Sequence, residues 1–131
     1  MRTILLTIVT FIFATGAFAQ SKADLVEKVL EVKNGKAIFT RLTEDNQNIP
    51  DAKKAEFKEL INKKAEELLN EARNYFMKKY SEEDLEEIYN ELNTPGRIAL
   101  SEKTLGFIRE YRSYKIKFQK YFKEKYIAYQ R

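Results

Sequence analysis

The longest periodic pattern in the chain lies in residues 51–80, which read DAKKAEFKELINKKAEELLNEARNYFMKKY. Apolar side chains recur there every three or four residues, which is the period of an amphipathic α-helix. They are Phe57, Leu60, Ile61, Leu68, Ala72, Tyr75 and Phe76. The stretch contains neither glycine nor proline, and Pro50 immediately precedes it. We therefore predict one continuous helix about 45 Å long, at 1.5 Å per residue.

The sequence on either side of this pattern predicts further helices and no strand. Ser81 is followed three residues later by Asp84, a capping-box pattern that starts a new helix directly after the long one. Upstream, residues 23–32 and 37–42 have the apolar spacing of two short helices. The whole chain has only 4 Gly and 2 Pro, so little interrupts helix formation. The predicted fold class is all-α, a compact bundle of five or six helices.

The clearest break in the chain is the segment 93–96, Asn-Thr-Pro-Gly. Proline is favoured at the first position of a helix, so this break can also serve as the start of the last helix, with Thr94 as its N-cap and Pro95 at the first helical position. Apolar and aromatic residues then continue the helical period nearly to the C-terminus. They are Ile98, Leu100, Leu105, Ile108, Tyr111, Phe118, Phe122 and Tyr126.

The first 19 residues have the three-part layout of a secretory signal peptide. Arg2 gives a positive start, an apolar stretch follows, and the small residues Ala17 and Ala19 flank Phe18 at the end. We expect cleavage after Ala19, although an uncleaved membrane anchor is the alternative reading. The predicted domains are thus a signal peptide, 1–19, and a single helical domain, 20–131, with no transmembrane segment in the mature chain. The predicted location is the periplasm or the extracellular medium.

Residues 75–105 also carry a resemblance to a known family. The sequence Tyr80-Ser-Glu-Glu-Asp-Leu, then Ile88-Tyr89, then Asn93-Thr-Pro-Gly-Arg resembles a bacterial family of exported helical proteins, catalogued as domain of unknown function family 2059. The resemblance implies an all-α exported domain. It implies no activity, cofactor or catalytic residue.

Two absences limit the chemistry that this chain can perform. It has no His and no Cys, so it lacks the commonest general base, the commonest zinc ligands and any disulfide. The acidic helix 81–92 remains as a possible source of catalytic carboxylates, at Glu82, Glu83, Glu86 and Glu87. The plainer reading is a solvated face whose acidic first turn suits the helix dipole. We assign no catalytic, cofactor-binding or metal-binding residue.

The C-terminal segment 109–131 differs in charge from the rest of the chain. It has eight basic and two acidic residues, a net charge of +6, whereas the rest of the mature chain has 15 basic and 18 acidic residues, a net charge of −3. Aromatic residues at spacings of three and four interleave with the lysines. They either pack into the core or form part of a binding surface. The residues most able to bind an anionic partner are Arg112, Lys117, Lys120 and Lys123.

These observations favour an exported helical binding or interaction module, without enzymatic activity, of unknown specific function. One alternative is a carboxylate-based enzyme that uses the acidic helix 81–92. The other is a binder of anionic envelope surfaces that uses the basic aromatic helix. The partner is then an envelope protein or an anionic surface. Nucleic acid is a poor candidate for an exported protein.

Overall fold

The computed structural model describes residues 22–96 and 99–130, and within those ranges it contains helices and no strand. A first helix covers residues 22–31 and leads into a 3₁₀ turn, η1 (Val32–Asn34). The remaining helices are α2 (Ala37–Glu44), α3 (Asp51–Lys79), α4 (Glu82–Asn93) and α5 (Glu102–Tyr129). These five α-helices confirm the predicted all-α bundle. The predicted signal peptide, 1–19, lies outside the described residues.

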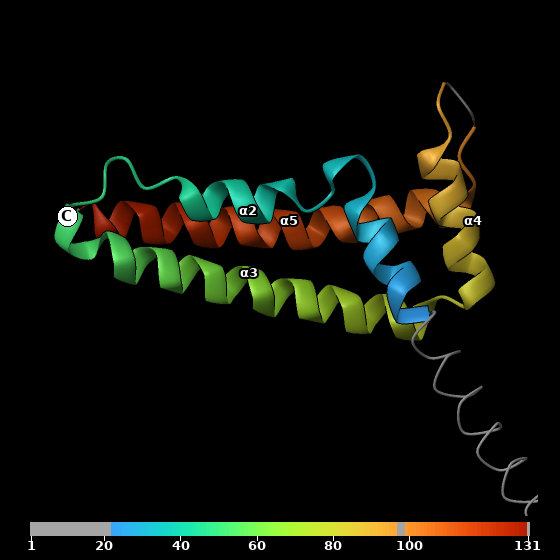
Figure 1. Ribbon diagram of the computed structural model, residues 1–131, viewed down its shortest axis with the longest axis horizontal. Coiled ribbons are helices and arrows are strands. Elements are labelled where there is room, and N and C mark those ends of the chain that lie inside the picture. The colour runs from blue at the N-terminus through green and yellow to red at the C-terminus, as the bar shows by residue number, and fades with distance from the viewer. Residues whose placement is uncertain (1–21, 97–98, 131) are drawn as a thin grey trace, which may run out of the picture.

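The two long helices, α3 and α5, lie side by side and run in opposite directions (Figure 1). α3 is continuous over 29 residues, as the periodic pattern predicted. α2 packs against both long helices, while α4 and the first helix lie at the end where α3 finishes and α5 starts (Figure 1). α5 therefore contacts three of the other labelled helices and organises the bundle.

One face of α5 forms a large part of the core. Phe107, Tyr111, Phe118 and Phe122 are all buried. Aromatic rings from α2 and α3 meet them at centroid distances that favour ring–ring attraction. The pairs are Phe76–Phe107 at 4.7 Å, Phe39–Phe118 at 5.0 Å and Phe57–Phe122 at 5.7 Å. Of the two readings of the C-terminal aromatic residues, packing into the core is therefore confirmed.

The start of α4 agrees with the sequence pattern, and the start of α5 does not. Ser81 and Asp84 form the predicted capping box. α5, however, begins at Glu102 with Ser101 as its N-cap, so the predicted start at Pro95 with Thr94 as cap was wrong. Thr94 instead ends α4, and Gly96 has a φ of 95°, which no helix allows.

Ser101 is favoured as the cap because a side chain from α4 holds it in place. The Glu91 carboxylate accepts hydrogen bonds from the Ser101 amide and hydroxyl, both at 2.8 Å, and from the Thr104 hydroxyl. The Ser101 hydroxyl in turn accepts from the Thr104 amide at 3.3 Å. Amides at the start of a helix need such partners, and this pair of residues supplies them.

Candidate functional site

On the side of α5 that is turned away from the core, seven of the exposed residues form a continuous row, which we call the outer face. Successive members are three or four residues apart, so all of them lie on one side of the helix. They are Leu105, Arg109, Arg112, Ile116, Lys120, Lys123 and Ile127.

The outer face has four basic members, and the exposed Glu102 lies on the same side of the helix, one turn before Leu105. In the part of the chain that the structure describes, none of these four makes an ion pair. Basic residues elsewhere behave differently: Lys36, Arg73 and Lys103 each lie within 4 Å of two carboxylates. The positive charge of the outer face is thus not neutralised within the described bundle, and it is available to an external anion.

The structure brings three of the four predicted binding residues together. Arg112, Lys120 and Lys123 lie on the outer face. Lys117 is also exposed but lies further round the helix, where it lines a shallow groove between α3 and α5 together with Lys120 and Glu71. Lys117 therefore belongs to the edge of the basic surface, next to an acidic residue, and not to its centre.

Three large apolar side chains interrupt the basic residues of the outer face. Leu105, Ile116 and Ile127 are 44%, 43% and 47% exposed. They are eleven residues apart, which is about three helical turns. The sequence analysis counted Leu105 among the residues of the apolar face, and that was wrong, because Thr104 and Phe107 occupy the buried positions. Ile116 and Ile127 were missed, although their regular spacing among lysines was a visible signal.

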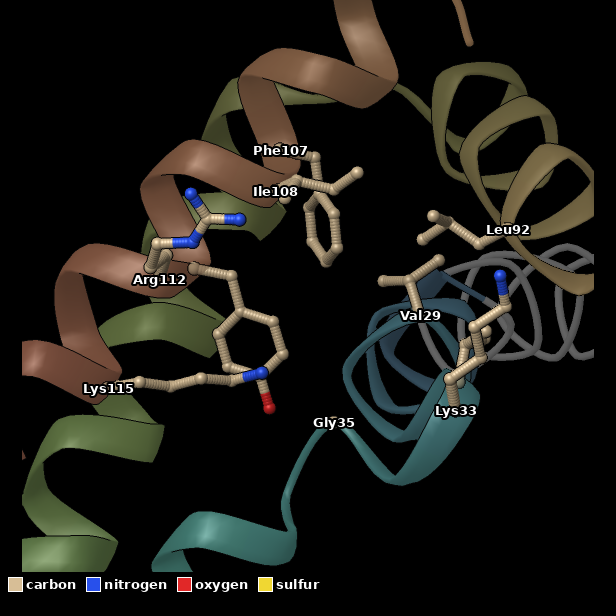
Figure 2. A pocket seen from close by; sticks show the side chains of 10 residues that line it. Val29, Lys33, Gly35, Leu92, Phe107, Ile108, Arg112 and Lys115 are labelled. Atoms are coloured by element: carbon tan, nitrogen blue, oxygen red, sulfur yellow. The ribbon is translucent and has the colours of Figure 1, made fainter. Parts of the chain in front are cut away.

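A small cavity of about 180 Å³ opens beside the outer face. Its apolar wall combines Val29 from the first helix, Leu92 from α4, and Phe107 and Ile108 from α5 (Figure 2). Three stretches that are distant in the sequence therefore meet here, and the first of them extends from Val29 through the turn at Gly35.

A buried hydrogen bond holds the two sides of this cavity together. The Tyr111 hydroxyl, on α5, donates to the carbonyl oxygen of Leu30, on the first helix, at 3.0 Å. Gly35 fits closely against both residues. A Cβ at position 35 would lie 2.1 Å from the Leu30 oxygen and 3.2 Å from the Tyr111 ring. Only glycine leaves this wall of the cavity undisturbed.

The cavity carries three basic side chains and no acidic one. Lys33, Arg112 and Lys115 line it. Arg112 and Lys115 extend from α5, and Lys33 stands on the opposite side (Figure 2). The Lys115 ammonium lies 4.2 Å from the centre of the Tyr111 ring. Burial, with a smaller contribution from the nearby Arg112, lowers the pKa of Lys115. Such a shift marks a cation that lacks an anionic partner.

Acidic side chains of α4 connect this helix to α5. Asp84 and Glu87 accept from the Lys103 ammonium at 2.7 and 2.8 Å, and Glu91 caps α5 as described above. Four carboxylates of this helix were suggested as catalytic. Glu83, Glu86 and Glu87 are exposed, and Glu82 is partly buried. These residues link α4 to α5 and lie along a solvated helix surface.

Within residues 22–96 and 99–130, no group of three or more His, Cys, Asp or Glu is placed to hold a metal ion. No described helix combines the length and the apolar character needed to cross a bilayer. Comparison of the chain with protein-family models, with curated proteins and with solved structures gives no significant match.

Proposed function

We propose that this protein is an exported, non-enzymatic helical binding module that attaches to anionic lipid surfaces through the outer face of α5. The observation that carries the proposal is the set of four exposed basic residues on that face, none of them in an ion pair within the described bundle. The aromatic side of the same helix is buried in the core, so the helix can present this face without unfolding.

The exposed apolar residues favour a lipid surface over other polyanions. A nucleic acid or an anionic polysaccharide offers charge to Arg109, Lys120 and Lys123 but little for the leucine and isoleucine side chains between them. A bilayer offers both, because its headgroups are anionic and the acyl region below them is apolar. Leu105, Ile116 and Ile127 lie on the same side of the helix as the basic residues, as such binding requires.

The expected strength follows from the number of charges. A basic residue near an anionic membrane surface contributes about 1 kcal/mol. The four basic residues of the outer face together contribute about 4 kcal/mol, and partial insertion of the three apolar side chains adds to this. Removing three of the charges should weaken binding by about 3 kcal/mol, or roughly 100-fold.

The proposal is tested by co-sedimentation with vesicles of phosphatidylglycerol and phosphatidylcholine. The assay uses residues 20–131, which contain every buried core residue that the structure describes and omit the predicted signal peptide. We expect binding that requires the anionic lipid and weakens as salt is added, because exposed charges are screened within about 10 Å at 0.1 M. The variant Arg109→Gln/Lys120→Gln/Lys123→Gln should lose most of this binding.

The matched control is Lys28→Gln/Lys63→Gln/Lys78→Gln, which removes three exposed lysines from other helices. Its binding should change by less than a few-fold. Equal losses in the two triple variants would show that only the net charge matters and would refute the assignment to the outer face. A second variant, Ile116→Ser/Ile127→Ser, separates lipid from polymer. It should weaken binding to vesicles and leave retention on a heparin column unchanged.

A further inference from the structure

The cavity between the first helix, α4 and α5 combines an apolar interior with unneutralised positive charge. Val29, Leu92, Phe107 and Ile108 supply the apolar surface, and the polar residues Lys33, Arg112 and Lys115 line its sides (Figure 2). This combination is typical of a ligand site, in which apolar walls bury the ligand body and a few polar groups fix its orientation.

None of the three cations has an anionic partner in the part of the chain that the structure describes. Neither Lys33, Arg112 nor Lys115 is in an ion pair, and no carboxylate lines the cavity. The nearest acidic residues along the first helix are already engaged, because Glu27 and Glu31 both bind Lys36. Partial burial of Lys115 without a counterion is unfavourable, and an anion placed here would relieve it.

The backbone at the edge of the cavity is strained. Lys33 and Asn34 have φ values of 53° and 58°, in the left-handed region that residues other than glycine adopt at a cost. The strained turn places the Lys33 side chain on the wall opposite Arg112 and Lys115 (Figure 2). Glycine would adopt this backbone conformation at position 33 at a lower cost in free energy. The lysine that occupies the position contributes a positive charge to the cavity.

We propose that this cavity is a binding site for a small amphipathic carboxylate, whose apolar body occupies the interior and whose carboxylate contacts Lys115 and Arg112. The volume sets the size of the body. A cavity of about 180 Å³ is slightly larger than an apolar protein cavity of about 150 Å³ that holds benzene. A single aromatic ring or a chain of about six carbons therefore matches the volume of this cavity.

This site overlaps the lipid-binding surface at one residue. Its apolar residues and Lys33 lie outside the outer face, and only Arg112 belongs to both surfaces. Lys115 separates the two, because it lines the cavity and is only partly exposed. Loss of one function can therefore be measured without loss of the other.

The test is a titration of residues 20–131 with benzoate and hexanoate, followed by ¹⁵N-resolved NMR, with benzyl alcohol and hexanol as neutral ligands of the same shape. We expect saturable shifts at Val29, Ile108 and Tyr111, and affinities for the carboxylates about tenfold or more above those for the alcohols. A tenfold difference is the effect of one hydrogen bond to a charged group.

Two variants locate the charge that is responsible. Lys115→Gln should lower the affinity for benzoate by about tenfold and leave benzyl alcohol binding unchanged. Lys33 is exposed, so Lys33→Gln should lower the affinity for benzoate by less than Lys115→Gln does. Lys33→Gln replaces Lys115→Gln in this test if Lys115→Gln does not fold. The control Lys120→Gln, on the outer face, should leave benzoate binding as in the unmodified protein.

Benzoate that binds no more tightly than benzyl alcohol would overturn the proposal. So would shifts spread over the whole of α5, or an affinity for benzoate that neither Lys115→Gln nor Lys33→Gln reduces. If Lys120→Gln has the same effect as Lys115→Gln, benzoate is responding to the general charge of the helix and the cavity is not a site.

Discussion

Replacement of Phe118 by alanine tests whether the aromatic side of α5 is structural. Phe118 is fully buried and its ring lies 5.0 Å from that of Phe39. A buried phenylalanine removes about 150–200 Å² from water, worth about 4 kcal/mol at 25 cal/mol per Å². Measured losses for Phe→Ala in protein cores are about 3–5 kcal/mol. A domain of this size has a total stability of about 5–15 kcal/mol, so the loss is a large fraction.

The assay is urea unfolding of residues 20–131 followed by circular dichroism. We expect Phe118→Ala to lower the free energy of unfolding by about 4 kcal/mol and the melting temperature by roughly 15–30 °C. The matched control is Ile116→Ala, two residues away on the same helix and 43% exposed, which should change stability by about 0.5 kcal/mol or less. If the two variants unfold at the same urea concentration, the aromatic face does not hold the bundle together.

Three further predictions concern the ends of helices and the strained turn. Ser81→Ala removes the hydroxyl that accepts from the Asp84 amide, one of the two hydrogen bonds of the capping box, and should lower the unfolding free energy by about 1 kcal/mol in urea titrations; an unchanged midpoint would show that the cap is dispensable. Hydrogen bonds from Thr104 and Ser101 lower the pKa of Glu91 below its ordinary value of 4.5, so its stabilising effect is present above pH 4.5 and is lost as the pH falls below it. Urea midpoints measured from pH 6 to pH 3 should accordingly fall less steeply for Glu91→Gln than for the unmodified protein, and parallel curves would contradict this role. Lys33→Gly relieves the left-handed backbone and should raise the unfolding free energy by up to about 1 kcal/mol while weakening benzoate binding; a loss of stability would show that the Lys33 side chain supports the turn.

The helices could be predicted where the deciding contacts are local. Ser81 and Asp84 are three residues apart and both hydrogen bonds of the capping box join them to each other, so the pattern contains both partners. The start of α5 could not be predicted in this way. Its cap depends on Glu91, ten residues upstream on another helix, and this contact outweighs the local preference of Pro95 for a first helical position.

Helical periodicity also left the orientation of α5 partly open. Leu105 lies beside the buried residue Thr104, and either residue fits an amphipathic pattern of three- and four-residue steps. Glu91 determines that Thr104 is the buried residue of the two. Its carboxylate accepts a hydrogen bond from the Thr104 hydroxyl, so this hydroxyl has a partner inside the bundle. The basic residues on the outer face were visible from charge alone. The cavity was not, since Lys33 and Lys115 become neighbours only when α5 packs against the first helix.

A ribosome makes α5 after α2 and α3, yet α5 supplies one ring to each of the seven aromatic pairs that join it to those two helices. Until it emerges, Phe39, Phe57 and Phe76 have no ring from α5 to pack against. Until α5 has been made, the new chain therefore exposes aromatic surface, a state that favours chaperone binding or aggregation. If translocation precedes folding, this order delays closure of the core and helps to keep the chain unfolded for passage through the membrane, because the core cannot close before α5 has been made.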